Sequence, residues 1–133
     1  MPPDRASPGS AKDWLRRARS DLVLAGLPLP DGVLYNDLCF HAQQAVEKCI
    51  KAVLVYHGVL LPKTHDIAHL IALLPDRTPP PPNAENAAGL TTYAVMLRYP
   101  GDYEDVTKED YHEAVQLATS VYTWAERIIA KRP

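Results

Sequence analysis

The sequence CFHAQQAVEKCIKAVL, residues 39–54, has the residue spacing of a long amphipathic helix. We expect this helix to run over about 33–57, because Gly58 stands where a left-handed C-cap residue is wanted and Pro62 follows. One arc of about 100° on a helical wheel collects its apolar side chains. They are Leu38, Ala42, Ala45, Val46, Cys49 and Val53. This face is predicted to enter a hydrophobic core.

Further helices are expected on either side of this one. Apolar residues recur at helical spacing in four other segments, about 11–26, 66–74, 84–99 and 108–131. Ser10 is an N-cap candidate with Asp13 three residues on, and Thr107 and Asp110 have capping-box spacing. Thr64 is placed to cap the helix expected over 66–74.

The fold class follows from these segments. No segment shows the period-2 alternation of a strand, and short connections between most of the helices favour antiparallel neighbours. We predict an all-α, up-and-down helical bundle of four to five helices over residues 11–133, preceded by a disordered N-terminal tail over 1–10.

The segment PDRTPPPPN, residues 75–83, is predicted to be a stiff, exposed loop. Prolines lack a backbone donor, and four in a row favour an extended polyproline conformation. A ligand for a proline-recognition module is the functional alternative. Gly89, inside the helix expected over 84–99, costs about 1 kcal/mol relative to alanine, which indicates a close approach of another helix.

The composition is that of one globular domain. The chain has 133 residues, 47% of them hydrophobic and 23% charged, and its net charge of -2 gives no general attraction to nucleic acid or anionic membranes. Cys39 and Cys49 would lie about 15 Å apart along one helix, which is too far for a disulfide, and they lack partners for a zinc site. Without a signal peptide or a membrane-spanning stretch, we expect a cytoplasmic protein.

The helix over 33–57 also has a polar stripe, consisting of Asp37, His41, Gln44, Lys48 and Lys51. Asp37 with His41, and Glu47 with Lys51, have the i,i+4 spacing of side-chain pairs on a helix surface. From spacing alone, a solvated helix face explains the stripe. No Gly-rich phosphate loop, HExxH, CxxC or nucleophile elbow occurs in the sequence.

The start of the helix over 66–74 offers a second polar group. His65 and Asp66 follow Lys63 there. A histidine at this place can cap the helix, bind phosphate together with the helix N-terminus, or act as an acid or base. For isolated residues, capping is the favoured interpretation.

Four segments together resemble the HEPN domain (higher eukaryotes and prokaryotes nucleotide-binding). They are DWLRRARSDLVLA at 13–25, CFHAQQAVEKCIKAVL at 39–54, LPKTHDIAHL at 61–70 and LRYPGDY at 97–103. The resemblance implies a helical bundle that forms a homodimer. It also implies a gene beside that of a minimal nucleotidyltransferase, in a toxin–antitoxin or stress-response pair. Many members of that family are RNases that need no metal and use an Arg, four to six intervening residues and a His.

The sequence departs from that RNase motif. No Arg stands at the required distance before any of its histidines, His41, His57, His65, His69 and His112. Lys51 before His57 and Lys63 before His69 have the spacing, but lysine lacks the planar fork of guanidinium. We therefore expect a non-catalytic protein without metal or cofactor.

The positions that match the family imply a set of residues that binds a nucleotide or RNA phosphate. The set is Gln44, Glu47, Lys48, Lys51, Lys63, His65, Asp66, Arg98 and Tyr99. Lys48, Lys51, His65 and Arg98 are expected to converge on one anion. The alternative for the same residues is a hydrogen-bonded lock between helix ends and a dimer interface, with no ligand.

Two other functions remain open. A ribonuclease toxin could use His65 or His112 with Lys51 or Arg98 in a variant site. A pure protein-interaction module would use the bundle surface and the proline-rich loop. Aromatic Tyr99, Tyr122 and Trp124, which a small bundle would not bury fully, add to the expectation of a homodimer.

Overall fold

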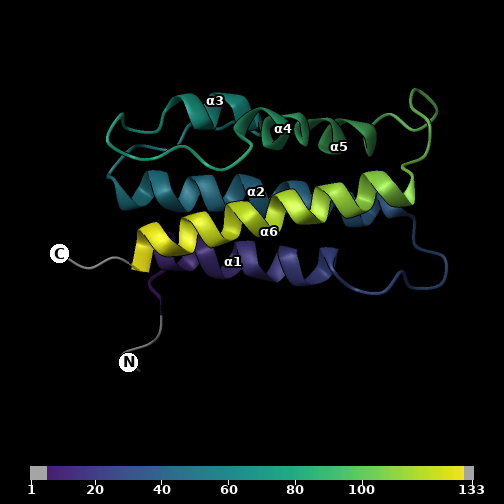
Figure 1. Cartoon of the computed structure of the whole chain (residues 1–133), viewed down its shortest axis with the longest axis horizontal. Coiled ribbons are helices and arrows are strands. Elements are labelled where there is room, and N and C mark those ends of the chain that lie inside the picture. The colour runs from purple at the N-terminus through teal and green to yellow at the C-terminus, as the bar shows by residue number, and fades with distance from the viewer. Residues whose placement is uncertain (1–5, 131–133) are drawn as a thin grey trace.

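In the computed structural model, residues 6–130 are described, and within them the chain forms helices and no strand (Figure 1). The helices are α1 (Ala11–Ala25), α2 (Tyr35–Tyr56), α3 (Ile67–Ala72), α4 (Ala84–Gly89), α5 (Thr91–Met96) and α6 (Lys108–Ala130). The all-α prediction is confirmed. Residues 1–5 of the predicted tail and 131–133 of the predicted bundle lie outside the described residues.

The helices form an up-and-down bundle around α2 (Figure 1). α1 and α6 pack extensively against α2, and they also contact each other. The fourth rod of the bundle consists of three short helices, of which α3 and α5 contact α2 and α4 contacts α6. The predicted architecture is therefore confirmed, with α2 in contact with every other rod.

The core contains the apolar arc of α2. All the positions predicted for it, from Leu38 to Val53, are buried. Cys39 and Cys49 are buried free thiols, as predicted. Burial raises the pKa of Cys39 to about 12 and also raises the pKa of Cys49, so both stay protonated at neutral pH.

The end of α2 has the backbone geometry that its sequence predicts. Gly58 has a φ of 76°, in the left-handed region. Its N–H donates to Val55 O, and the N–H of Val59 donates to Leu54 O, at 2.9 Å in each case. These two bonds form a Schellman motif, which satisfies carbonyls that the helix end would leave unpaired.

The single helix predicted over 84–99 is divided into α4 and α5 at Leu90. Around this residue the backbone hydrogen bonds join residues three apart, as in a 3₁₀-helix, and not four apart. They run from Leu90 N to Ala87 O and from Tyr93 N to Leu90 O. A Cβ atom added to Gly89 would meet nothing within 4 Å, so the predicted close helix approach is wrong. Gly89 instead stands at the end of α4.

The helix predicted over 66–74 is shorter, and its cap is a different residue. Asp66 is the N-cap of α3, and its carboxylate accepts the N–H of Ala68. Thr64 accepts the N–H of Asp66 at 3.1 Å and so supports the turn before the helix. The predicted Thr64 cap is therefore wrong by two residues.

The proline-rich loop packs against the bundle more closely than predicted. Thr78 and Pro81 are buried. The indole N–H of Trp124 donates to Pro79 O at 2.9 Å, and Thr78 Oγ1 lies 2.6 Å from His57 Nε2. The loop therefore covers Trp124, which is only 8% exposed, and this residue gives no support for a dimer.

The start of α1 is held by reciprocal capping bonds. Ser10 Oγ accepts the N–H of Asp13 at 3.2 Å, and the Asp13 carboxylate accepts the N–H of Gly9 at 3.0 Å. This confirms Ser10 as the N-cap. The Gly9 hydrogen bond, helped by Arg16 and Arg17, lowers the pKa of Asp13 to about 2. The capping box of Thr107 and Asp110 is also formed.

We predict that Asp13→Asn lowers the free energy of unfolding at neutral pH. A carboxyl whose pKa is about 2 in the folded chain and 3.8 unfolded stabilises the fold above pH 3.8 and loses this effect as the pH falls toward 2. The difference between the native chain and the variant should therefore shrink over that window in urea titrations. A constant difference down to pH 2 would contradict the prediction.

Candidate functional site

Three buried carboxylates stand on the helices α1 and α2. Asp13, Asp21 and Glu47 are 4%, 7% and 2% exposed. Each contacts two basic side chains. Burying an ionised carboxylate is costly unless it is paired and hydrogen-bonded. The positions of the basic groups are therefore set by the burial of the acids.

Glu47 joins α2 to the segment before α3. Its carboxylate accepts from Lys51 Nζ at 3.0 Å and from Gln43 Nε2 at 3.1 Å, and His65 Nδ1 lies 3.1 Å from Oε1. Lys51 Nζ also lies 5.3 Å from the centroid of the Trp14 ring on α1, a cation–π distance. The predicted Glu47–Lys51 pair is confirmed. Because Glu47 and Lys51 are both buried, a solvated helix face does not describe them.

Asp21 joins α1 to α2. Its carboxylate accepts from Lys48 Nζ at 2.6 Å, and His41 Nδ1 lies 3.0 Å from the other oxygen. The expected pair of His41 with Asp37 is not formed, because the buried Asp21 is the partner and Asp37 is exposed. Lys48 and Lys51, the two lysines of the polar stripe, thus both contact α1.

These contacts lie on one face of the bundle. Asp13, Arg17 and Asp21 are four residues apart on α1 and therefore share a side of that helix. Lys51 reaches α1 at Trp14, and Lys48 reaches it at Asp21. We call this surface the basic face and define it by its cationic and His side chains. They are Arg16, Arg17, His41, Lys48, Lys51 and His65.

The basic face keeps free donors. Four of its side chains are permanently cationic, and only three carboxylates are paired with them. Each lysine has three N–H donors, of which the carboxylate uses one. His41 and His65 meet their carboxylates through Nδ1, and no residue between 6 and 130 is hydrogen-bonded to either Nε2. An anion on this face would meet oriented donors.

Most of the predicted binding set belongs to this face or borders it. Gln44 donates to Gln43 Oε1 at 2.7 Å and so extends the Glu47 cluster. Lys63 is exposed two residues before His65. Asp66 is used as the cap of α3.

Arg98 and Tyr99 are not brought to this face. Leu97 and Tyr99 line a depression together with Leu34 and Asp37, at the N-terminal end of α2. Lys48 stands eleven residues after Asp37, about 16 Å along the helix axis. The segment after α5 and the start of α3 lie at opposite ends of the bundle (Figure 1). Arg98 therefore does not share an anion with Lys48 and His65.

Sequence reasoning missed the partners that orient the basic groups. They are Asp13, Trp14 and Asp21. One signal was available for Asp21, which stands on the same side of α1 as the buried Ala18 and Ala25. A carboxylate on a buried face requires a cationic partner, but the sequence does not show which one.

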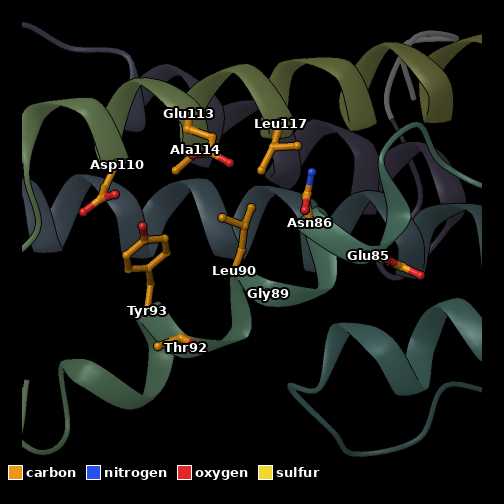
Figure 2. Close-up of a pocket in the computed structure, with 10 residues that line it drawn as sticks. All are labelled: Glu85, Asn86, Gly89, Leu90, Thr92, Tyr93, Asp110, Glu113, Ala114 and Leu117. Carbon is orange, nitrogen blue, oxygen red and sulfur yellow. The ribbon is translucent and has the colours of Figure 1, made fainter.

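A separate cavity of about 270 Å³ lies between α4, α5 and α6 (Figure 2). Glu85, Asp110 and Glu113 stand around it, and none of the basic residues between 6 and 130 lines it. Burial, together with nearby Cys39, Asp110 and Glu113, raises the pKa of Tyr93 to about 12. These acidic side chains would repel a phosphate, so the cavity is not a second site for an anion.

Two classes of site and segment are not found among residues 6–130. No helix there combines the length and the apolar character that crossing a membrane requires. Within the same range, no three His, Cys, Asp or Glu side chains are close enough together to hold a metal ion.

The sequence of this helical bundle matches the model of a known protein family. The HEPN domain family model matches residues 11–128. The chain therefore belongs to the HEPN domain family.

Individual proteins resemble the chain over most of its length. It is 29% identical to the Methanocaldococcus jannaschii protein named "Putative toxin MJ1304", over 84% of this chain and 82% of that protein. Among solved structures it is similar to TT1696 from Thermus thermophilus, with 31% identity and a TM-score of 0.78 over 90% of this chain and 98% of that one. ST0689, described as an archaeal HEPN homologue, gives 27% identity and a TM-score of 0.69 over the same shares of the two chains.

We predict that Glu47→Gln destabilises the fold by about 3–5 kcal/mol, because it leaves the buried Lys51 without its anion. Lys51→Met should be destabilising alone, and it should offset part of the Glu47→Gln effect in the double variant. Urea unfolding of the four proteins in this double-mutant cycle measures the coupling. Strictly additive effects would contradict the pairing.

Proposed function

We propose that this chain is a non-catalytic HEPN protein that binds a nucleotide or an RNA phosphate on its basic face. The observation that carries the proposal is the arrangement of basic groups around three buried carboxylates, which fixes the positions of these groups and leaves each with further N–H donors. Orienting donors before binding reduces the entropy lost when a ligand binds. Lys48, Lys51 and His65 would contact the phosphate, with exposed Lys63 beside them.

The biological setting that we propose is a toxin–antitoxin or stress-response pair. A relative that matches most of the chain carries the word toxin in its name. By the resemblance to HEPN proteins, the partner would be a minimal nucleotidyltransferase, and the pair would act in the cytoplasm. A nucleotidyltransferase gene next to the gene for this chain would support the partner assignment.

The absence of the Arg–His motif supports a non-catalytic role. The two Lys–His pairs with similar spacing do not replace it. His57 contacts Thr78, and burial followed by the charge of Arg77 lowers its pKa. His69 is exposed on α3 and has no hydrogen bond among the described residues. Of the four residues in these pairs, Lys51, His57, Lys63 and His69, only Lys51 belongs to the basic face.

A variant ribonuclease is the second candidate, and one contact favours it. His65 and Lys51 share the carboxylate of Glu47, so a general base and a cation lie close together. His112 is exposed near the start of α6 and is far along the chain from this cluster. Incubation of purified protein with short RNA separates the two candidates. Cleavage that Lys51→Met or His65→Ala abolishes would contradict the non-catalytic proposal.

We predict micromolar binding of ATP or a short RNA in calorimetry at low salt. Lys63→Ala and Lys48→Ala should each weaken it about tenfold, the loss of one charge-assisted hydrogen bond of about 1.4 kcal/mol. Lys63 is exposed, so its variant tests the ligand without disturbing the fold.

Lys108→Ala is the matched control for this measurement, since Lys108 is also exposed but stands at the start of α6. Its affinity should equal that of the native chain. If no nucleotide or RNA binds, the basic face is a lock between helices, and the nucleotide part of the proposal fails.

We predict a homodimer, on the resemblance to HEPN proteins. Light scattering at high protein concentration should give twice the chain mass of 14.7 kDa. A monomer under those conditions would contradict the dimer. It would leave the ligand proposal to be decided by the calorimetry.

A further inference from the structure

One end of the bundle exposes apolar side chains on two loops. These are the α1–α2 loop, residues 26–34, and the α5–α6 loop, residues 97–107, which lie at the same end in Figure 1. Leu34, Leu97, Tyr99 and Tyr103 are 53%, 37%, 56% and 46% exposed. These four side chains line a shared depression. They form an apolar surface that the bundle itself does not cover.

The α5–α6 loop is held in place by hydrogen bonds that its backbone N–H groups donate. Val106 N donates to Asn36 Oδ1 at 3.1 Å and ties the α5–α6 loop to the start of α2. Asp102 N donates to Tyr99 O at 3.2 Å across Pro100 and Gly101, whose φ is 97°. Proline followed by a glycine of positive φ is the pattern of a type II turn. Tyr99 and Tyr103 are thus presented on either side of a defined turn.

The depression has a volume of about 160 Å³. Sites for small organic ligands usually have volumes of roughly 300–1,000 Å³. A space of this size fits one bulky side chain of a partner. Exposed tyrosines around a small apolar pocket are typical of the central residues of protein–protein interfaces.

The charge around the depression is acidic. Asp37 and Asp105 line it, and Asp102 and Glu104 are exposed beside Tyr103. Arg98 is the one cation in residues 97–107. This charge disfavours a nucleic acid. It also disfavours a second copy, because a two-fold contact would place the same acidic side chains opposite each other.

We propose that this surface, the acidic end patch of Leu34, Asp37, Leu97, Tyr99, Tyr103 and Asp105, docks a protein segment with one bulky apolar anchor flanked by lysine or arginine. The anchor enters the depression, and the basic flanks meet Asp37, Asp102, Glu104 and Asp105. The patch lies at the N-terminal end of α2, and Glu47 stands ten residues after Asp37, about 15 Å along the helix axis. The proposal does not depend on ligand binding at the basic face.

The test uses two labelled synthetic peptides that share one leucine anchor, one with lysine flanks and one with glutamate flanks. Fluorescence anisotropy of the full chain should show saturable binding of the lysine peptide alone. The affinity should fall with added salt, because exposed charges are screened. Leu34→Ser should weaken binding about tenfold, as should the double variant Asp102→Lys, Glu104→Lys.

Leu60→Ser is the matched control, since Leu60 is a leucine that is 92% exposed outside the patch. It should bind the peptide as the native chain does. Leu34 is the residue before α2 and makes no side-chain capping bond, so its variant is expected to fold, which circular dichroism checks.

Three results would overturn the docking proposal. The first is equal binding of the two peptides or no binding of the lysine peptide. The second is native affinity both in Leu34→Ser and in the double variant Asp102→Lys, Glu104→Lys. The third is a change of molecular mass in light scattering on Leu34→Ser, which would make the patch a contact between copies. Loss of nucleotide binding in Lys63→Ala would leave the docking result unaffected, so the two proposals fail independently.

Discussion

The burial of the Glu47 carboxylate is the constraint from which the rest of the site follows. A charged group with 2% exposure must be paired, and Glu47 is paired within α2 by Gln43 and Lys51 and across the bundle by His65. The bond to His65 holds the chain between α2 and α3 against the helix. Asp21 repeats the arrangement between α1 and α2 with Lys48 and His41.

The same pairing explains how basic side chains stay oriented on a chain with a small negative net charge. Each carboxylate binds one donor of a lysine or arginine, so the positions of these cations are fixed although the site is close to neutral. At the N-terminal end of α2, acids such as Asp105 stand around exposed tyrosines, and these acids form no ion pair with residues 6–130. The bundle therefore presents two chemically different surfaces, which suit the anionic ligand and the basic partner segment that we propose.

Much of the fold could be predicted from the sequence because it depends on local patterns. The apolar arc of α2, the Ser10 cap and the Gly58 helix end are properties of residues close in the chain, and all were confirmed. The single helix expected over 84–99 was not confirmed, because the hydrogen bonds between residues three apart around Leu90 also depend on packing. Thr91 Oγ1 accepts the N–H of Ile67 from another helix at 3.2 Å, a contact that no local pattern shows.

In the candidate site, too, the features that depend on local sequence could be predicted, and those that depend on packing could not. The sequence alone determined that Glu47 and Lys51 lie one helical turn apart, and that Lys48 and His65 are available as basic groups. Only the tertiary structure decided that Lys48 meets Asp21 on α1, that His65 meets Glu47, and that Arg98 lies at the far end of the bundle. Helical spacing determines which residues share a face. The partner of a buried charge is determined by which helices pack together, and that depends on the whole chain.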